Sequence, residues 1–310
     1  MARNNNQVIF ITIDTEGDNL WEWKEGDPIT TNNLIYLMQF QLLCEKYLIK
    51  PIYLMNYEAA SDLRWCDFIS KKAKEGLCEI GLHLHAWNTP PYYSLPNVLN
   101  GNPYITEYPK NVISQKITST ISLIYKNCGI KVKSHRSGRW AYSNEYFEEL
   151  KKQGICVDCS FVPSIDLSQI SGRTSFCKGA NYKNVKNKIF ELESGLLEIP
   201  LTTVKTRMLL SKSFSSKMKT LLLGKVFTLR PTGLANNSLV KIAHKCKQRN
   251  FIEFMIHSSE LMPGGSPYYS TKKDIDVLLN EIEKFFLMLK KYSVRSMTFI
   301  DYLKDIEKNG

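Results

Sequence analysis

The stretch "CEIGLHLH" (78–85) decides the class of fold that we expect for this chain. It is an apolar run of strand length that ends in two polar residues, His83 and His85. Further runs of this kind lie at 7–14, 51–56, 132–140, 155–162, 251–260 and 295–300. Segments with helical spacing of apolar residues separate them, near 33–49, 61–75, 111–127, 144–154, 238–249 and 271–291. Strands that alternate with helices predict an α/β fold with a parallel sheet, either doubly wound or closed as a barrel.

The strand–helix units number about seven, somewhat fewer than the eight of the commonest barrel. Region 163–235 breaks the alternation and is predicted as an insertion after the fifth strand. A chain of 310 residues can form one large α/β domain or two modules, and we expect a single domain over 1–310. Neither GxGxxG nor GxxxxGK[ST] occurs, so the usual nucleotide-binding signatures are missing.

The composition is that of a soluble globular protein, with 43% hydrophobic and 23% charged residues. The net charge of +11 indicates anionic neighbours such as nucleic acid, a phospholipid surface or a charged glycan. Nucleic acid is not favoured, because no recognised binding motif accompanies the charge. The N-terminal segment lacks the pattern of a secretory signal, and the scattered cysteines contain one CxxC, Cys156 and Cys159. We therefore expect reduced thiols and a cytoplasmic protein.

Ionisable residues occupy the C-terminal ends of several expected strands, where the loops of parallel α/β folds converge. They are Asp14 and Glu16, His83 and His85, His135 and Arg136, Asp158, and His257. Side chains two positions apart on a strand share a face, so the two histidines of "HLH" can reach one point. Two imidazoles and one carboxylate suit a catalytic zinc or a similar divalent ion. A second carboxylate beside the ion can accept a proton.

Each of these residues also has an ordinary structural interpretation. An HxH pair alone is more often a polar strand end, and a DxE pair can cap a helix that follows a strand. His257 alone can be a hydrogen-bonded core histidine, and Arg136 alone a structural ion-pair partner. Their joint occurrence on successive strands favours a metal site.

At these residues the chain resembles the polysaccharide deacetylase family, the NodB-homology domain of carbohydrate esterase family 4. The segments that carry the resemblance are "TIDTEG" (12–17), "HLH" (83–85), "HRSGRW" (135–140) and "FMIHSSE" (254–260). The resemblance implies a distorted (β/α) barrel, typically of seven strands, that binds a divalent metal, commonly zinc. The DxE and HxH spacings depart from the common family motifs and are similar to a divergent branch linked to surface-polysaccharide biosynthesis.

The resemblance also implies roles for single residues. Asp14 corresponds to the catalytic base, Arg136 to the arginine that steadies the catalytic acid residue, and His257 to the general acid. Glu16, His83 and His85 correspond to the metal ligands. The changed spacing leaves the division between Asp14 and Glu16 as base and ligand open.

A further set of residues is predicted to bind substrate: Trp87, Arg139, Trp140, Asp158, Glu260 and Tyr268. The two tryptophans follow motifs and either stack on a sugar ring or pack as core residues. Asp158 lies in "VDCS", the visible remnant of the fourth family motif. Glu260 and Tyr268 belong to "SSELMPGGSPYY", which is interpreted as a loop that faces substrate.

The sequence therefore predicts a metal-dependent hydrolase that removes an N-acyl group, in particular N-acetyl, from an amino sugar in a cell-surface glycan or a lipid-linked precursor. The alternatives are an amide hydrolase of the same fold that acts on another substrate, deformylase-like or allantoinase-like, and an inactive carbohydrate-binding relative. Segment 204–230 is rich in Lys and Arg and has no acid. It is either a basic amphipathic stretch resting on the inner membrane surface or a solvated insertion.

Overall fold

The computed structural model describes residues 7–24, 26–208, 210, 224–232, 234 and 237–309. The chain forms two compact units. The first unit contains 1–13, 17–51 and 201–310, and the second contains 14–16 and 52–200. The expected single domain over 1–310 stays a prediction. None of the eight cysteines, all of which lie within the described residues, is joined to another by a disulfide bond.

The second unit is built on short parallel strands that are buried on both faces. In order across the sheet they are β2 (Pro51–Met55), β3 (Glu79–Leu84), β4 (Ser134–Ser137), β5 (Val157–Asp158) and β7 (Leu197–Glu198). Strand β6 (Phe190–Glu191) pairs with β7 in the antiparallel sense. Gly81 allows the close packing of β3, because a Cβ there would lie 2.5 Å from Ser134 Oγ. Continuous burial is typical of parallel strands covered by helices.

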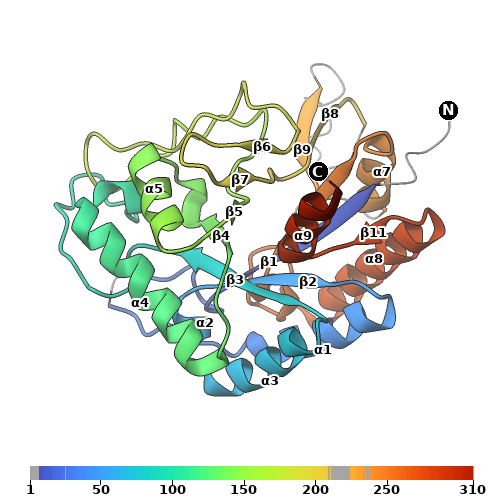
Figure 1. The fold of residues 1–310 in the computed structure, drawn as a ribbon, viewed down its shortest axis with the longest axis horizontal. Coiled ribbons are helices and arrows are strands. Elements are labelled where there is room, and N and C mark those ends of the chain that lie inside the picture. The colour runs from blue at the N-terminus through green and yellow to red at the C-terminus, as the bar shows by residue number, and fades with distance from the viewer. Residues whose placement is uncertain are drawn as a thin grey trace. The chain divides into compact units, whose positions relative to one another are not determined.

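Helices cover these strands (Figure 1), and local capping sets where several of them begin or end. They are α2 (Tyr57–Ser61), α3 (Leu63–Lys74), η1 (Ile105–Glu107), α4 (Lys110–Cys128), η2 (Gly138–Trp140) and α5 (Asn144–Lys152). The helix expected near 61–75 is confirmed as α3, which starts at Leu63 because Asp62 caps it by accepting from the N–H groups of Arg64 and Trp65. Gly129, with φ 70°, ends α4 in the left-handed conformation.

The first unit combines β1 (Val8–Thr15) up to Ile13 with strands and helices from the C-terminal third of the chain. These are β10 (Phe251–His257), β11 (Arg295–Ser296), the hairpin of β8 (Thr203–Thr206) and β9 (Lys225–Thr228), α1 (Leu34–Lys46), α7 (Ser238–Lys245), η3 (Ser258–Leu261), α8 (Lys272–Lys291) and α9 (Phe299–Asn309). Strand β11 pairs with β1 in parallel. Phe254 stacks on Phe285, and Phe10 packs against Phe299, so aromatic rings join the strands to the helices.

Two expectations change in the C-terminal half. The strand expected over 295–300 is wrong beyond Ser296, because Phe299 begins α9 and the hydroxyl of Thr298 accepts the N–H of Asp301 at its start. The region 163–235 does follow the fifth strand. Its part in the second unit supplies β6 and β7, and β7 extends the sheet beyond β5.

No helix among the described residues is long and apolar enough to cross a membrane. The basic segment predicted at 204–230 contributes β8 and β9 to the first unit. Its residues 209 and 211–223, which carry much of the predicted amphipathic pattern, lie outside the described residues.

Candidate metal centre

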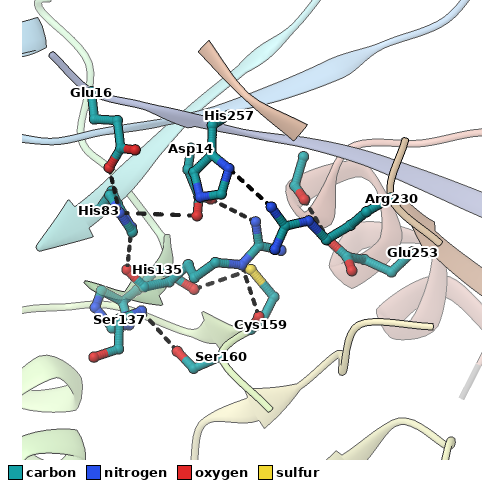
Figure 2. A network of polar contacts seen from close by, with 12 residues as sticks. Asp14, Glu16, His83, His135, Ser137, Cys159, Ser160, Arg230, Glu253 and His257 are labelled. Atoms are coloured by element: carbon teal, nitrogen blue, oxygen red, sulfur yellow. Dashed lines mark hydrogen bonds and ion pairs between the residues drawn. The ribbon is translucent and has the colours of Figure 1, made fainter. Parts of the chain in front are cut away.

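Three ionisable side chains of the second unit converge at the ends of β1 and β3. His83 Nε2 lies 3.4 Å from Glu16 Oε2, and His85 Nε2 lies 2.9 Å from the same oxygen. The two Nε2 atoms are 3.0 Å apart. Glu16 and His83 are buried, and the side chain of His85 is 11% exposed. The predicted ligands thus form a candidate metal-binding triad, of which Figure 2 shows Glu16 and His83.

The donor set of this triad fits a divalent ion. His83 Nδ1 lies 2.9 Å from the carbonyl oxygen of Arg136, which can only accept, so Nδ1 carries a proton. In the neutral ring the lone pair on His83 Nε2 then faces His85 and Glu16. A single N–H on His85 cannot satisfy both neighbours, whereas a cation satisfies all three atoms. Tetrahedral zinc with N and O ligands separates its ligand atoms by about 3.3 Å, close to the distances observed here.

The surroundings of the two histidines differ in their electrostatic effect. Burial by itself lowers the pKa of His83, but the charges of Asp14 and Glu16 and a hydrogen bond to the carboxylate of Glu16 raise it above its ordinary value. Burial lowers the pKa of His85, and the neighbouring His83 lowers it further. The carboxylate-rich side of the triad therefore attracts a positive charge, either a proton or a metal ion.

Close packing fixes the ring of His85. Trp87 lies against it, with ring centroids 4.3 Å apart. On another side is Gly138, where an added Cβ would lie 2.5 Å from His85 Nδ1 and 2.6 Å from the carbonyl oxygen of Leu84. The glycine of "HRSGRW" therefore makes room for a predicted metal ligand, which the sequence pattern alone does not reveal.

Asp14 stands beside the triad and is held by an arginine. Its Oδ1 accepts from Arg136 Nη1 at 2.7 Å, and its Oδ2 lies 3.9 Å from His83 Nε2. Arg136 is fully buried, donates through Nε to the carbonyl oxygen of Cys159, and has the ring of Trp140 5.4 Å from its guanidinium. The buried guanidinium of Arg136 therefore stabilises the ionised form of the Asp14 carboxylate.

A second histidine–carboxylate pair lies on the neighbouring strands β4 and β5. His135 Nδ1 lies 2.6 Å from Asp158 Oδ1, and His135 Nε2 lies 2.8 Å from the hydroxyl of Tyr146. Asp158 also accepts from the N–H and the hydroxyl of Ser160. Asp158 has no exposed surface, so its observed contacts are internal, and its predicted role in substrate binding stays a prediction.

The other aromatic and basic residues of the "HRSGRW" motif also make internal contacts. The guanidinium of Arg139 lies 3.9 Å from the ring centroid of Tyr104 and donates to the carbonyl oxygens of Asn102 and Ser171. Arg139 and Trp140 both adopt positive φ, 57° and 58°. The substrate-binding roles of Trp87, Arg139 and Trp140 stay predictions.

Two charged residues near the site were missed by the sequence reasoning. Burial, together with the charge of Glu16, raises the pKa of Glu58 to about 7. Glu58 accepts from Asn88 Nδ2 at 2.6 Å. Lys116 Nζ is buried and donates to the carbonyl oxygens of Thr89 and Pro91, which fixes the loop that follows Trp87. The only sequence signal was an acid after a strand and a lysine on the apolar face of a helix.

The remaining predicted residues belong to the first unit. His257 ends β10, and Glu260 follows on η3 with no exposed surface. Trp21, which the sequence reasoning did not select, lies edge-on to His257 and to Tyr268, with centroids 5.2 and 5.7 Å apart. Arg230, also not selected, lies 3.1 Å from His257 Nδ1. The roles of His257 as acid and of Glu260 and Tyr268 in substrate binding stay predictions.

No protein-family model matches the chain, and no curated protein matches it by sequence. Solved structures do share its fold. A candidate polysaccharide deacetylase from Mycobacterium smegmatis has a TM-score of 0.59 at 13% identity, and the match covers 98% of this chain and 91% of that chain. A GH57 branching enzyme from Thermococcus kodakaraensis has a TM-score of 0.56 at 10% identity. The match covers 97% of this chain and 71% of that chain.

A third similar structure is a 4-alpha-glucanotransferase from Thermococcus litoralis, with a TM-score of 0.52 at 12% identity; the match covers 96% of this chain and 38% of that one. At such low identities the likeness shows the fold alone. It confirms the predicted α/β fold class. This is the (β/α) barrel type of fold that the polysaccharide deacetylase neighbour has. The chemistry has to be argued from the residues of the site.

Proposed function

We propose that this chain is a metal-dependent N-deacetylase that acts on an amino sugar of a cell-surface glycan or a lipid-linked precursor. The observation that carries the proposal is the convergence of Glu16, His83 and His85 beside the Asp14–Arg136 ion pair. Three ligands next to a carboxylate that is not needed as a ligand match the requirements of hydrolysis at a metal centre. The shared fold with a candidate polysaccharide deacetylase supports the same reaction class.

The residues of the triad are proposed to hold zinc, which when bound polarises an amide carbonyl as a Lewis acid. Asp14 is proposed to accept the proton of the attacking water, because the guanidinium of Arg136 beside it favours the ionised carboxylate. In this proposal Glu16 is the ligand and Asp14 is the base, and the grouping of Glu16 with the two histidines supports that division. His257 is proposed to protonate the departing amine.

Acetate release tests the proposal. The purified protein is loaded with zinc and incubated with N-acetylglucosamine oligomers and with N-acetylated glycolipid extracts. We expect acetate release that stops after metal removal by chelation and returns when zinc is added. The Asp14→Asn variant should keep its metal and lose at least about a hundredfold in kcat, since it lacks the general base. The exposed Asp67→Asn variant on α3 serves as the control.

The alternatives are distinguished by the same assay. Release from small formamides or cyclic amides without release from any N-acetyl sugar would favour the small-molecule amide hydrolase. Metal and sugar binding without turnover of any substrate would favour the inactive carbohydrate-binding relative. Either result would contradict the proposed deacetylase.

The location of the protein is a separate proposal. A cytoplasmic protein that contacts the inner membrane surface through 204–230 would meet a lipid-linked sugar there. Co-sedimentation with vesicles rich in anionic lipid should be strong at low salt and weaken as salt screens the attraction. Absence of binding at low salt would contradict membrane contact.

A further inference from the structure

The imidazole of His257 meets a cation and an anion at the same nitrogen. Arg230 Nη2 lies 3.1 Å from Nδ1, and Glu260 Oε2 lies 3.2 Å from Nδ1. Arg230 Nη2 and Glu260 Oε2 are 3.9 Å apart. Figure 2 shows Arg230 directed at the ring. All three residues belong to the first unit, and Trp21, which packs edge-on against the ring, carries no charge.

Both charged partners are held independently of His257's side chain. Glu260 has no exposed surface and accepts the backbone N–H of His257 at 2.9 Å through Oε2, while Oε1 accepts from the hydroxyl of Thr232. Arg230 follows β9, its side chain is 17% exposed, and its Nη2 also lies 3.3 Å from Thr232 Oγ1. Burial by itself raises the pKa of Glu260, but His257 and Arg230 lower it below its ordinary value, so the carboxylate is ionised.

The chemistry of the partners limits where the proton of His257 can reside. A guanidinium has donors only, and an ionised carboxylate has acceptors only. When Nδ1 carries a proton it therefore bonds to Glu260. When Nδ1 is bare it accepts from Arg230, and in the neutral ring the proton is then on Nε2.

We propose that Arg230 and Glu260 are alternating partners of Nδ1, so that both tautomers of His257 are held in one ring orientation. Arg230 is then a positioning residue, which acts through His257. The relevance to catalysis rests on the proposed function, in which His257 passes a proton to an amine. The exchange of partners at Nδ1 does not depend on that function.

The tautomer of His257 can be measured by long-range proton–nitrogen NMR on the full chain labelled with 15N-histidine, recorded over a pH series from which the spectra of the neutral ring are selected. The signals of His257 are identified by their loss in His257→Gln. In Arg230→Met, Nδ1 should move to the resonance position of a protonated nitrogen, because Glu260 is left as its partner. In Glu260→Gln, Nδ1 should move the opposite way, toward an unprotonated nitrogen.

Arg230→Lys, which retains a donor, should return Nδ1 toward the wild-type position. Arg295→Met is the matched control, because Arg295 pairs with Asp305 in the same unit, and it should leave the His257 signals unchanged. Identical Nδ1 positions in wild type, Arg230→Met and Glu260→Gln would overturn the proposal. The two substitutions are expected to move the Nδ1 resonance in opposite directions. If one variant fails to fold, the other therefore still tests the proposal.

A kinetic measurement separates this inference from the proposed function. If the wild type releases acetate, Arg230→Met should lower kcat by about tenfold or more with KM nearly unchanged, since it alters proton transfer and not substrate contact. A fall in kcat/KM that arises only from KM would overturn the positioning role. If the wild type releases no acetate but the tautomers move as expected, the proposed function fails and the exchange of partners at Nδ1 stands.

Discussion

His83 and His135 lie on adjacent strands of the second unit, and both are buried beside carboxylates, yet their surroundings differ in kind. His135 lies in the middle of a series of hydrogen bonds, in which the hydroxyl of Tyr146 donates to His135 Nε2 and His135 Nδ1 donates to Asp158. Every proton in that series has one acceptor. At His83, by contrast, Nε2 meets Glu16 and His85 Nε2 at a single point.

The difference teaches how to distinguish a structural histidine from a candidate ligand. A linear chain of donors and acceptors satisfies a neutral imidazole, and accordingly burial lowers the pKa of His135 although Asp158 opposes it. Lone pairs that converge on one point repel one another, and a proton or a metal cation at that point removes the repulsion. The comparison can be tested by substituting residues in each of the two clusters in turn, the one around His83 and the one around His135.

The largest effect is expected from His83→Gln. Removal of one of three ligands should lower the bound divalent metal from about one equivalent to less than half an equivalent and abolish acetate release. Elemental analysis of the purified variant measures this directly. His244→Gln, on α7 of the first unit, is the control and should retain its metal. Full metal occupancy in His83→Gln would remove the basis for the candidate centre.

Asp158→Asn should leave the metal in place and destabilise the fold. The substitution takes the charged acceptor from a fully buried pair, which costs about 3–5 kcal/mol of unfolding free energy. Urea denaturation followed by circular dichroism measures the loss, and Asp67→Asn on the exposed face of α3 should change stability by less than about 0.5 kcal/mol. Loss of metal without loss of stability would reverse the assignment of the two clusters.

Glu58 makes the stability of the metal-free protein depend on pH. Its folded pKa of about 7 lies above the ordinary 4.5, so the folded state keeps a proton that the unfolded state loses between these values. Stability contributed by this proton is present below pH 4.5 and is lost as the pH rises to 7.

Glu58→Gln should therefore raise the unfolding free energy at pH 8 relative to pH 5, by at most about 3 kcal/mol. Urea titrations in chelator at the two pH values, with Glu145→Gln at an exposed position as the control, measure the difference. An equal pH dependence in wild type and Glu58→Gln would contradict the raised pKa.

The smallest effect is expected from Gly138→Ala. The added Cβ would lie too close to His85 Nδ1 and to the carbonyl oxygen of Leu84, so the ring must shift. Displacing a ligand from its fixed orientation should weaken metal binding by about 10- to 100-fold. Competition with a chromophoric chelator measures the affinity. Unchanged affinity would show that the packing around His85 does not position it for a metal.

The sequence by itself determined the α/β class and most elements of the fold. Alternating apolar runs and amphipathic segments are local patterns, and the helices over 110–128 and 272–291 follow them closely. The sequence also selected His83 and His85, because side chains two apart on a strand share a face whatever the rest of the fold does, and the family resemblance added Glu16.

Only the tertiary structure decided which contacts the other polar residues make. Whether Asp158 is exposed, and whether Asp14 pairs with Arg136, depends on neighbours from strands far apart in the sequence. The sequence marked His135 as a polar strand end equal to His83, and the difference arose from Tyr146, which α5 places against it. Arg230 carried no signal at all, because its contact with His257 joins segments 27 residues apart through folding and not through any local pattern.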